Sequence, residues 1–264
     1  MLPIGRLLHQ RYASLHKRSC GLGLESSLPN KHLLHLPHFP DTVNTTRTSS
    51  LVAVVFDLDG LMFDTETLYA ETARQILERR QKQLTDDLLH DMMGRKSDES
   101  LAIMIERRQL SDTVEQLRNE TDQIFAELIK TDLVPMRGLW ELLDALQSHQ
   151  IPLAIATSSR RNNVDPILDK FEIRPRFQFV LTSENVKNGK PHPEIYLTAA
   201  EQLGMPTRNI MVLEDSQNGC GSAVAAGTMA VAVPGEHSRH HDFSGAAFIA
   251  DGLDDERIWQ ALGI

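Results

Sequence analysis

Short apolar runs alternate with amphipathic segments along most of the chain. Five apolar runs predict strands: Val52–Phe56, Pro152–Thr157, Phe179–Leu181, Asn209–Leu213 and Met229–Val233. The segments between the later runs have helical spacing and predict single helices: Leu139–Ser148, Asn163–Phe171, Pro193–Leu203 and Gln217–Ala226. Strands separated by single helices imply right-handed crossovers and a parallel sheet. The pattern therefore predicts an α/β fold in three layers, with Phe248–Ala250 as a further edge strand.

A helical segment interrupts this alternation near its start. From residue 65 to residue 133, apolar residues recur with 3.6-residue spacing and no strand pattern occurs among them. We therefore expect three to four helices, inserted as a cap (65–133) into a core that is formed by residues 51–64 and 134–264.

The first 50 residues differ from the rest in composition. They contain five histidines, three prolines before position 40 and a stretch rich in Ser, Thr and Asn from 41 to 50, with weak periodicity. We expect residues 1–50 to form a disordered extension. Their acid-poor start, which contains arginine, is also typical of an organelle transit peptide. Two interpretations stay open. Residues 1–50 either direct import into an organelle, or they are an idle tail or an over-extended start of the sequence. We favour the idle tail or over-extended start.

Charge and cysteine content exclude several classes of protein. The net charge is −9, although residues 1–50 hold six Lys or Arg against two acidic residues. The acidic remainder argues against a nucleic-acid-binding surface. No run of 18 apolar residues occurs, so no membrane span is expected. Two cysteines cannot build a disulfide framework, which fits a reducing, cytoplasmic location. A monomer is the expected state.

Two pairs of carboxylates follow strand patterns. Asp57 and Asp59 come directly after the first apolar run, where Gly60 lets the chain turn, and Glu214 and Asp215 come at the end of the fourth. Ligands bind at the carboxyl ends of parallel strands, and paired carboxylates are suitable Mg²⁺ ligands. Either pair alone could also consist of turn or helix-cap residues. Together they predict a carboxylate nucleophile and a carboxyl acid/base beside a hard cation.

Two hydroxyl residues and a lysine complete the group of candidate site residues. Thr157 and Ser158 end the second strand pattern, where hydroxyl and backbone N–H groups at a helix start can bind phosphate; such residues are also common helix caps. Lys190 lies in Asn-Gly-Lys-Pro-His-Pro-Glu, whose prolines stiffen the loop, and the alternative is a solvated lysine. Because these elements come from successive strand ends, the sequence predicts one site at one sheet edge.

Four strings resemble the haloacid dehalogenase superfamily. In order, they are Phe-Asp-Leu-Asp-Gly, Ala-Thr-Ser-Ser-Arg, Gly-Lys-Pro-His-Pro and Leu-Glu-Asp-Ser-x-Asn-Gly. The resemblance covers about residues 51–235. It points to the phosphatase and phosphomutase branch, which has a Rossmann-like core and a helical cap after the first strand. Asp59 separates this branch from the true dehalogenases, which lack it and need no metal.

The resemblance implies a role for each catalytic residue. Asp57 would attack phosphorus and form an aspartyl-phosphate, and it also belongs to the implied metal site. Asp59 would protonate the leaving oxygen and then activate the water that hydrolyses the intermediate. Lys190 would offset the negative charge around Asp57 and the phosphate.

The resemblance also implies a Mg²⁺ cofactor and a phosphate pocket. Asp215 would ligate the ion directly, Glu214 directly or through water, and Asp59 through its backbone carbonyl. Thr157 and the N–H of Ser158 would hold phosphoryl oxygens.

Residues of the cap distinguish a phosphatase from a mutase. The β-phosphoglucomutases carry a histidine and an arginine at two cap positions that are Tyr69 and Ser97 here. Both departures favour a phosphatase. Arg95, Lys96 and Tyr69 are the candidates for contacting the leaving group of the substrate.

We therefore expect a Mg²⁺-dependent phosphatase acting on a small phosphorylated sugar, polyol or nucleoside monophosphate. A β-phosphoglucomutase-like sugar phosphate isomerase is the alternative. An inactive phosphate- or metal-binding protein is a third interpretation, which is disfavoured because no motif residue is missing.

Overall fold

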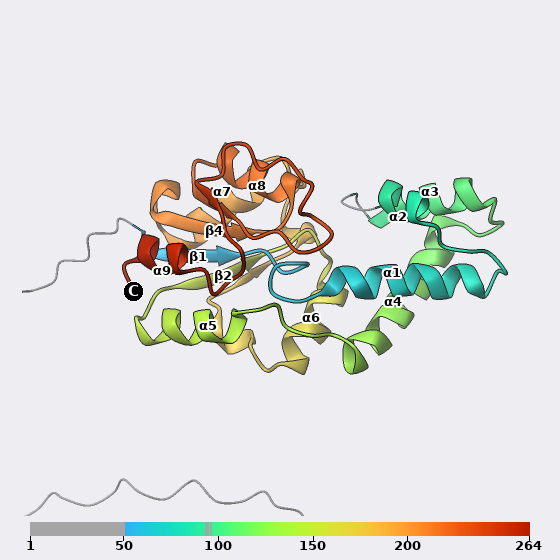
Figure 1. The fold of residues 1–264 in the computed structure, drawn as a ribbon, viewed down its shortest axis with the longest axis horizontal. Helices are drawn as coiled ribbons and strands as arrows, with labels where there is room; N and C mark the ends of the chain where they lie inside the picture. Colours follow the sequence, from blue (N-terminus) through green and yellow to red (C-terminus); the bar gives the residue numbers. More distant parts are fainter. Residues whose placement is uncertain (1–50, 93–94, 96) are drawn as a thin grey trace, which may run out of the picture. The chain divides into compact units, whose positions relative to one another are not determined.

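A parallel sheet forms the centre of the structure. The computed structural model describes residues 51–92, 95 and 97–264. In these residues, six strands pair in the order β3-β2-β1-β4-β5-β6, and each neighbouring pair is parallel (Figure 1). The strands are β1 (Ala53–Phe56), β2 (Leu153–Ala156), β3 (Val180–Leu181), β4 (Ile210–Glu214), β5 (Met229–Ala232) and β6 (Phe248–Ile249). The predicted parallel sheet is confirmed.

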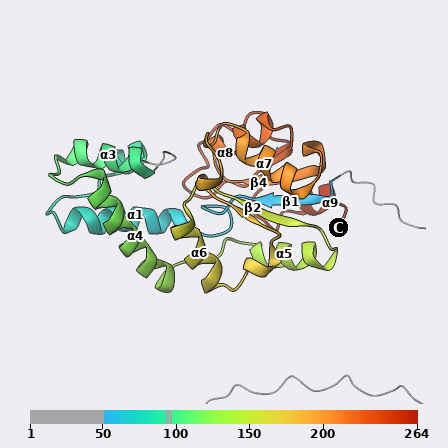
Figure 2. The same cartoon turned by 180° about the vertical axis from the view of Figure 1, so that it is seen from behind.

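Helices cover both faces of this sheet, as Figures 1 and 2 show from opposite sides. Val54 and Phe56 of β1 pack with α5, α6 and α9 on one face, and Ala53 and Val55 pack with α7 and α8 on the other. This alternation follows from the two-residue period of a strand. The three-layer α/β prediction is confirmed. The helices are α5 (Leu139–Ser148), α6 (Arg161–Lys170), α7 (Glu194–Leu203), α8 (Gln217–Ala225) and α9 (Glu256–Leu262), with 3₁₀ turns η1 (Arg174–Arg176), η2 (Ser183–Asn185) and η3 (Thr207–Asn209).

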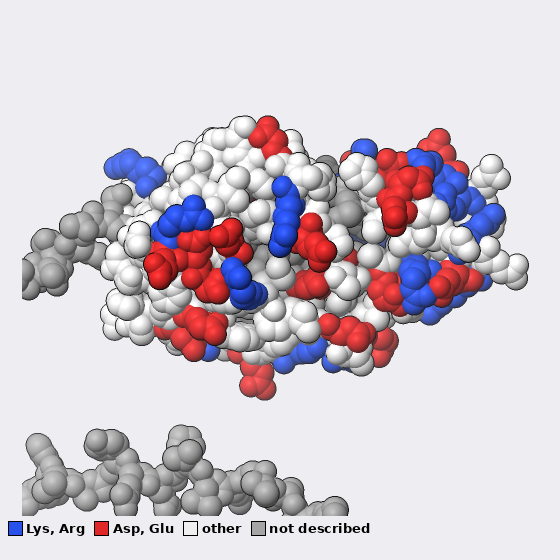
Figure 3. All heavy atoms as spheres, viewed as in Figure 1, with Lys and Arg blue, Asp and Glu red and all other residues white. Residues whose placement is uncertain are grey.

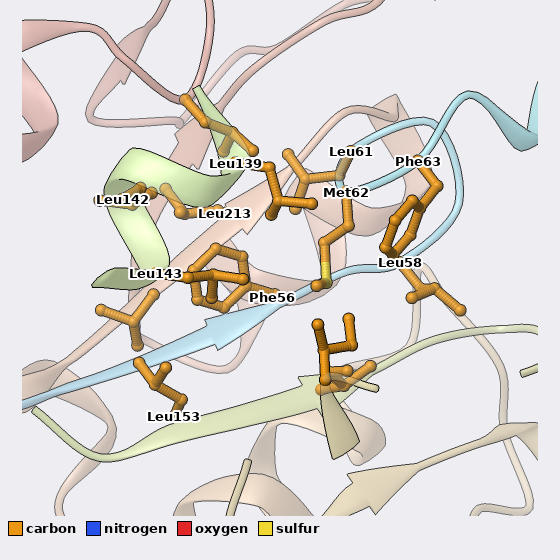
Figure 4. Close-up of a cluster of buried hydrophobic side chains, with 14 of the residues drawn as sticks. Phe56, Leu58, Leu61, Met62, Phe63, Leu139, Leu142, Leu143, Leu153 and Leu213 are labelled. Carbon is orange, nitrogen blue, oxygen red and sulfur yellow. The ribbon is translucent and has the colours of Figure 1, made fainter. Parts of the chain in front are cut away.

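The larger buried cluster anchors the first strand and the loop after it. Phe56 and Leu153 of the sheet meet Leu142 and Leu143 of α5, and each is at most 3% exposed (Figure 4). Full burial of each such side chain contributes about 1.5–3 kcal/mol. The cluster continues into residues 58–63, so apolar packing also fixes the loop that carries Asp59.

Four helices form the insert between β1 and α5: α1 (Thr65–Glu78), α2 (Asp86–Met92), α3 (Ser97–Arg108) and α4 (Val114–Thr131). They enclose a buried apolar cluster of their own. The Asp64 carboxylate accepts a hydrogen bond from Thr67 N over 3.2 Å and caps α1. Thr113 and Gln116 form a capping box that starts α4.

The two linkers between the sheet and the cap helices run side by side. Asp64 N donates to Val134 O over 3.0 Å, and Met136 N donates to Met62 O over 2.9 Å. The Lys170 ammonium of α6 donates to two main-chain carbonyls at and just beyond the end of α4. It thereby satisfies carbonyls that a helix end leaves without partners.

Residues 1–50, and with them the expected disordered extension, lie outside the described part of the chain. Among the helices that are described, none combines the length and apolar character needed to cross a membrane. On the face drawn in Figure 3, Lys and Arg side chains are interspersed with Asp and Glu over the cap helices.

Two glycines with positive φ allow a matched test of packing at the second linker. Gly138 has φ +83°, and a Cβ there would lie 2.3 Å from the Asp254 backbone N. Gly204 has φ +65°, with nothing within 4 Å of a Cβ. We expect Gly204→Ala to lower the free energy of unfolding by about 1–2 kcal/mol and Gly138→Ala to lower it by roughly 3–5 kcal/mol. Urea denaturation measures both, and equal losses would contradict the close approach at Gly138.

A salt-bridge cluster within the cap should make its stability depend on pH. Arg80 lies 2.7 Å from both Asp112 and Glu120, and its hydrogen bonds lower the pKa of each carboxyl below the ordinary 3.8 and 4.5. Groups with lowered pKa stabilise the fold above their ordinary pKa, and this stabilisation is lost as the pH falls through the lowered values. We expect Arg80→Met to cost about 1 kcal/mol at pH 7 and progressively less toward pH 3.

The control for this test is Lys130→Met. It removes a pair with Glu127 whose side chains are 65% and 74% exposed, and it should change the free energy of unfolding little at any pH. A cost of Arg80→Met that does not vary between pH 7 and pH 3 would refute the linkage.

Candidate active site

A buried group of charges lies where strands β1, β2 and β4 end. The Lys190 ammonium, carried by the loop between η2 and α7, lies 2.5 Å from Asp57 Oδ1 and 2.6 Å from Glu214 Oε1. It also donates to Ala156 O at the end of β2 over 2.9 Å. The three charged side chains are at most 8% exposed. The structure thus brings residues from three strand ends and one loop into direct contact.

The charges of this group do not balance. Three buried carboxylates, of Asp57, Glu214 and Asp215, lie around a single buried ammonium. Burial, which outweighs the attraction of Lys190, raises the pKa of Asp57 well above its ordinary value, and burial beside Glu214 does the same to Asp215. Burial opposes the charge of Lys190, but the two carboxylates that it contacts raise its pKa. The excess of negative charge favours the binding of a cation.

The donor set fits a divalent cation. Asp57, Glu214 and Asp215 each offer a carboxylate oxygen, and these oxygens lie within 4.8 Å of one another. Hard cations such as Mg²⁺ prefer oxygen ligands of this kind. Gly60 lies close to the same group, because a Cβ at that position would be only 2.5 Å from Asp215 Oδ2. A larger residue at position 60 would therefore displace one of the donors.

Glu214 is held by more partners than the sequence indicated. Its Oε1 accepts hydrogen bonds from Lys190 and, over 2.7 Å, from the Tyr196 hydroxyl. Its Oε2 accepts from the backbone N and the Oγ of Ser216. Gly219 leaves the space for this carboxylate, since a Cβ there would lie 1.8 Å from Glu214 Oε1. The sequence offered no signal for Tyr196, and Gly219 entered only as the last residue of the Leu-Glu-Asp-Ser-x-Asn-Gly string.

Asp59 is bound by two hydroxyl groups from the loop after β2. Thr157 Oγ1 donates to Asp59 Oδ2 over 2.9 Å, and Ser159 Oγ donates to the same oxygen over 2.7 Å. Thr157 is fully buried, whereas the neighbouring Ser158 is exposed. Ser159 was not among the predicted residues, although it lies in the same Thr-Ser-Ser string. A turn in the backbone therefore decides which hydroxyl of that string faces Asp59.

Of the two predicted cap residues that the structure describes, Tyr69 is brought to this group and Arg95 is not. The Tyr69 ring stacks on Phe125 with centroids 4.4 Å apart, and its hydroxyl lies 3.4 Å from Ser159 Oγ. Burial raises the pKa of this hydroxyl, so it stays neutral. Arg95 is exposed and donates to Asp91 O of its own cap segment, and Lys96 lies outside the described residues.

Comparison with known proteins agrees with this geometry. A family model described as haloacid dehalogenase-like hydrolase matches residues 54–233. The phosphorylated carbohydrates phosphatase of Thermotoga maritima is 36% identical over 179 residues, which cover 66% of this chain and 81% of that protein. The β-phosphoglucomutase of Bacillus subtilis is 28% identical over 190 residues, which cover 69% of this chain and 82% of that protein.

A solved structure shows the same fold. The crystal structure of CbbY from Rhodobacter sphaeroides in complex with phosphate has a TM-score of 0.69 and 25% identity, and covers 77% of this chain and 95% of that chain. The family match extends over well more than half of the 264 residues and includes every strand end that carries the buried charges. The chain therefore belongs to the haloacid dehalogenase-like hydrolase family.

Proposed function

We propose that this protein is a Mg²⁺-dependent phosphatase that hydrolyses a small phosphorylated sugar, polyol or nucleoside monophosphate through an aspartyl-phosphate. One observation carries the proposal: the buried Lys190 ammonium holds Asp57 among an excess of carboxylates at the carboxyl edge of the sheet. A phosphoryl group is attacked and released with little covalent help from a protein, so positioning and charge neutralisation supply most of the catalysis. The curated relative from Thermotoga maritima, named a phosphorylated carbohydrates phosphatase, supports the substrate class.

In the first step, Asp57 is the nucleophile. Lys190 binds Oδ1, which leaves the other carboxylate oxygen to attack phosphorus in line with the leaving group. As the bond from Asp57 to phosphorus forms, the bond from phosphorus to the leaving oxygen breaks, and Asp59 gives that oxygen a proton. In the second step, Asp59 takes a proton from water, whose oxygen attacks phosphorus and frees Asp57 as phosphate departs.

Asp57, Asp215 and the backbone carbonyl of Asp59 are proposed to hold Mg²⁺. Glu214 is proposed to act through water, because both of its oxygens already accept hydrogen bonds within the protein. When bound, the ion neutralises charge on the transferring phosphoryl group. Thr157 and the N–H of Ser158 are proposed to hold phosphoryl oxygens, as at other strand-to-helix turns.

A β-phosphoglucomutase-like isomerase is the second candidate, because the relative from Bacillus subtilis carries that name. Tyr69 argues against it. At the position of the mutase histidine, its hydroxyl is neutral and lies beside Ser159 and Asn163. Ser97, at the position of the mutase arginine, has no charge to hold the second phosphate of a bisphosphate intermediate.

We also propose that the protein acts as a monomer in the cytoplasm. The low cysteine content supports a reducing compartment. Gel filtration of the purified full chain tests the monomeric state. The N-terminal residue of the protein from its native cell tests the cytoplasmic location.

Phosphate release from a panel of sugar, polyol and nucleoside monophosphates tests the function. We expect release with Mg²⁺, loss of release with EDTA, and recovery when Mg²⁺ is added back. Asp57→Asn keeps the size of the side chain but weakens the nucleophile, and it should lower kcat roughly 10³-fold or more. Circular dichroism confirms that the variant is folded.

The panel includes β-glucose 1-phosphate, with the formation of glucose 6-phosphate followed in parallel. Isomerisation much faster than any hydrolysis would establish the mutase in place of the phosphatase. No release of phosphate from any member of the panel, by folded protein with Mg²⁺, would refute the proposal.

A pair of glycine substitutions in α8 tests the placement of Glu214. Gly219→Ala forces a Cβ into the Glu214 carboxylate, so we expect a loss of roughly 3 kcal/mol or more in the free energy of unfolding and a weaker response of the activity to Mg²⁺. Gly221→Ala is the matched control. Its nearest neighbour would be Pro191 Cβ at 3.7 Å, an ordinary contact, and it should leave the activity unchanged and stabilise the helix by about 0.5–1 kcal/mol.

A similar loss of stability in the two glycine variants would show that Gly219 does not make room for Glu214. Urea denaturation and a Mg²⁺ titration of phosphate release provide both readouts.

A further inference from the structure

Asp59 carries an uneven set of hydrogen bonds. Its Oδ2 accepts from two hydroxyl groups, those of Thr157 and Ser159. Its Oδ1 is buried and has no hydrogen-bond partner among the residues that the structure describes. One oxygen of this carboxyl group is therefore fixed by the protein, and the other is left for another partner.

The Ser159 hydroxyl is the last donor in a chain of hydrogen bonds that starts at Asn163 on α6 and passes through Tyr69 on α1. Since Ser159 Oγ donates its single proton to Asp59, its 3.4 Å contact with Tyr69 is satisfied only when the tyrosine hydroxyl donates. Asn163 Nδ2, on α6, in turn donates to the Tyr69 oxygen over 3.4 Å. Every donor in the chain from Asn163 through Tyr69 and Ser159 points toward Asp59. The four side chains therefore form one continuous chain of hydrogen bonds that ends at Asp59 Oδ2.

Thr157 cannot donate its hydroxyl proton to Asp59 throughout the reaction. A threonine hydroxyl has one proton to donate, and the proposed phosphate pocket requires that proton for a phosphoryl oxygen. When Thr157 turns to phosphate, Ser159 is the hydroxyl that remains on Asp59 Oδ2. The Ser159 backbone N donates to Thr157 Oγ1 over 3.0 Å, so the two residues stay linked while that exchange takes place.

We propose that Ser159 is a positioning residue that holds Asp59 by Oδ2 and presents Oδ1 to the leaving oxygen of the substrate. The proposal rests on the phosphatase function, in which Asp59 is the acid. With Oδ2 bound by the Ser159 hydroxyl, Oδ1, which has no partner among the described residues, is the oxygen left to face the leaving group. Ser159 thus orients the carboxyl group of Asp59, without itself touching the reacting atoms.

The dependence of rate on the leaving group separates this role from a merely structural one. A phosphate ester of an alcohol needs a proton on its leaving oxygen, whereas 4-nitrophenolate leaves without one. Because Asp59 also acts as the base in the second step, the two esters are compared in the first step alone, in a single turnover with enzyme in excess. We expect Ser159→Ala to slow the release of the leaving group about 10- to 100-fold for an alkyl phosphate and less than about threefold for 4-nitrophenyl phosphate. Ser159→Thr, which restores a hydroxyl, should recover most of the lost rate with the alkyl ester.

Two further variants calibrate the result. Asp59→Asn removes the acid and should show the same selective loss in the first step, only larger, whereas its second step should slow with both esters because the base is lost as well. Ser183→Ala removes a hydroxyl that donates to the Ser159 carbonyl over 3.3 Å, so it loosens the same loop without touching Asp59. It should lower the rates with both esters equally or not at all. A loss in the first step of Ser159→Ala that is equal for both esters would overturn the proposal.

Crystal structures of the wild type and Ser159→Ala with inorganic phosphate give a readout that needs no activity. In the wild type, Asp59 should keep its Oδ2 on Ser159 while Thr157 contacts phosphate. In Ser159→Ala, the Asp59 carboxylate should turn away from this position. An unmoved carboxylate would refute the role of Ser159 even if the enzyme is active, whereas a moved carboxylate in a protein that hydrolyses no ester would refute only the phosphatase function.

Discussion

The Lys190 ammonium is the interaction on which the remainder of the site depends. It is buried with Asp57 and Glu214 and also bound to the Ala156 carbonyl, so it ties three strand ends together from a loop outside the sheet. Without this cation, adjacent buried carboxylates would repel one another and would lose their ionised form. With it, a negative excess still remains, and that excess favours the binding of a cation. The lysine thus makes the acidic cluster compatible with folding without neutralising it.

Close packing around this cluster limits how the site can vary. Glu214 fits only because Gly219 has no side chain, and Asp215 lies against Gly60 in the same way. On the other face of β1, large apolar side chains hold the strand and the loop that follows it. The positions of the buried carboxylates are thus well defined. Small residues let these groups approach closely on one side, and bulky residues prevent movement of the backbone on the other.

The fold and the general place of the site could be predicted from the sequence for a simple physical reason. Buried parallel strands are short apolar runs, and their carboxyl ends meet at one edge, so the sequence alone places Asp57, Glu214 and Asp215 together. The partners of these groups could not. Tyr196 reaches Glu214 from the first turn of α7, and Ser159 in place of Ser158 faces Asp59 because of a local turn. Such contacts depend on side-chain directions that periodicity does not encode.

In the cap, too, the sequence indicated a residue of the site but not its contacts. The family resemblance indicated Tyr69 as a residue near the substrate, and the structure joins its hydroxyl to Asp59 through Ser159 on the core. Tyr69 is carried by α1, while Ser159 and Asn163 both follow β2, so the hydrogen-bond chain crosses from the core to the cap and back. Both hydroxyl groups that bind Asp59 directly, those of Thr157 and Ser159, lie on the core. The cap contributes one neutral hydroxyl, that of Tyr69, which reaches Asp59 only through Ser159.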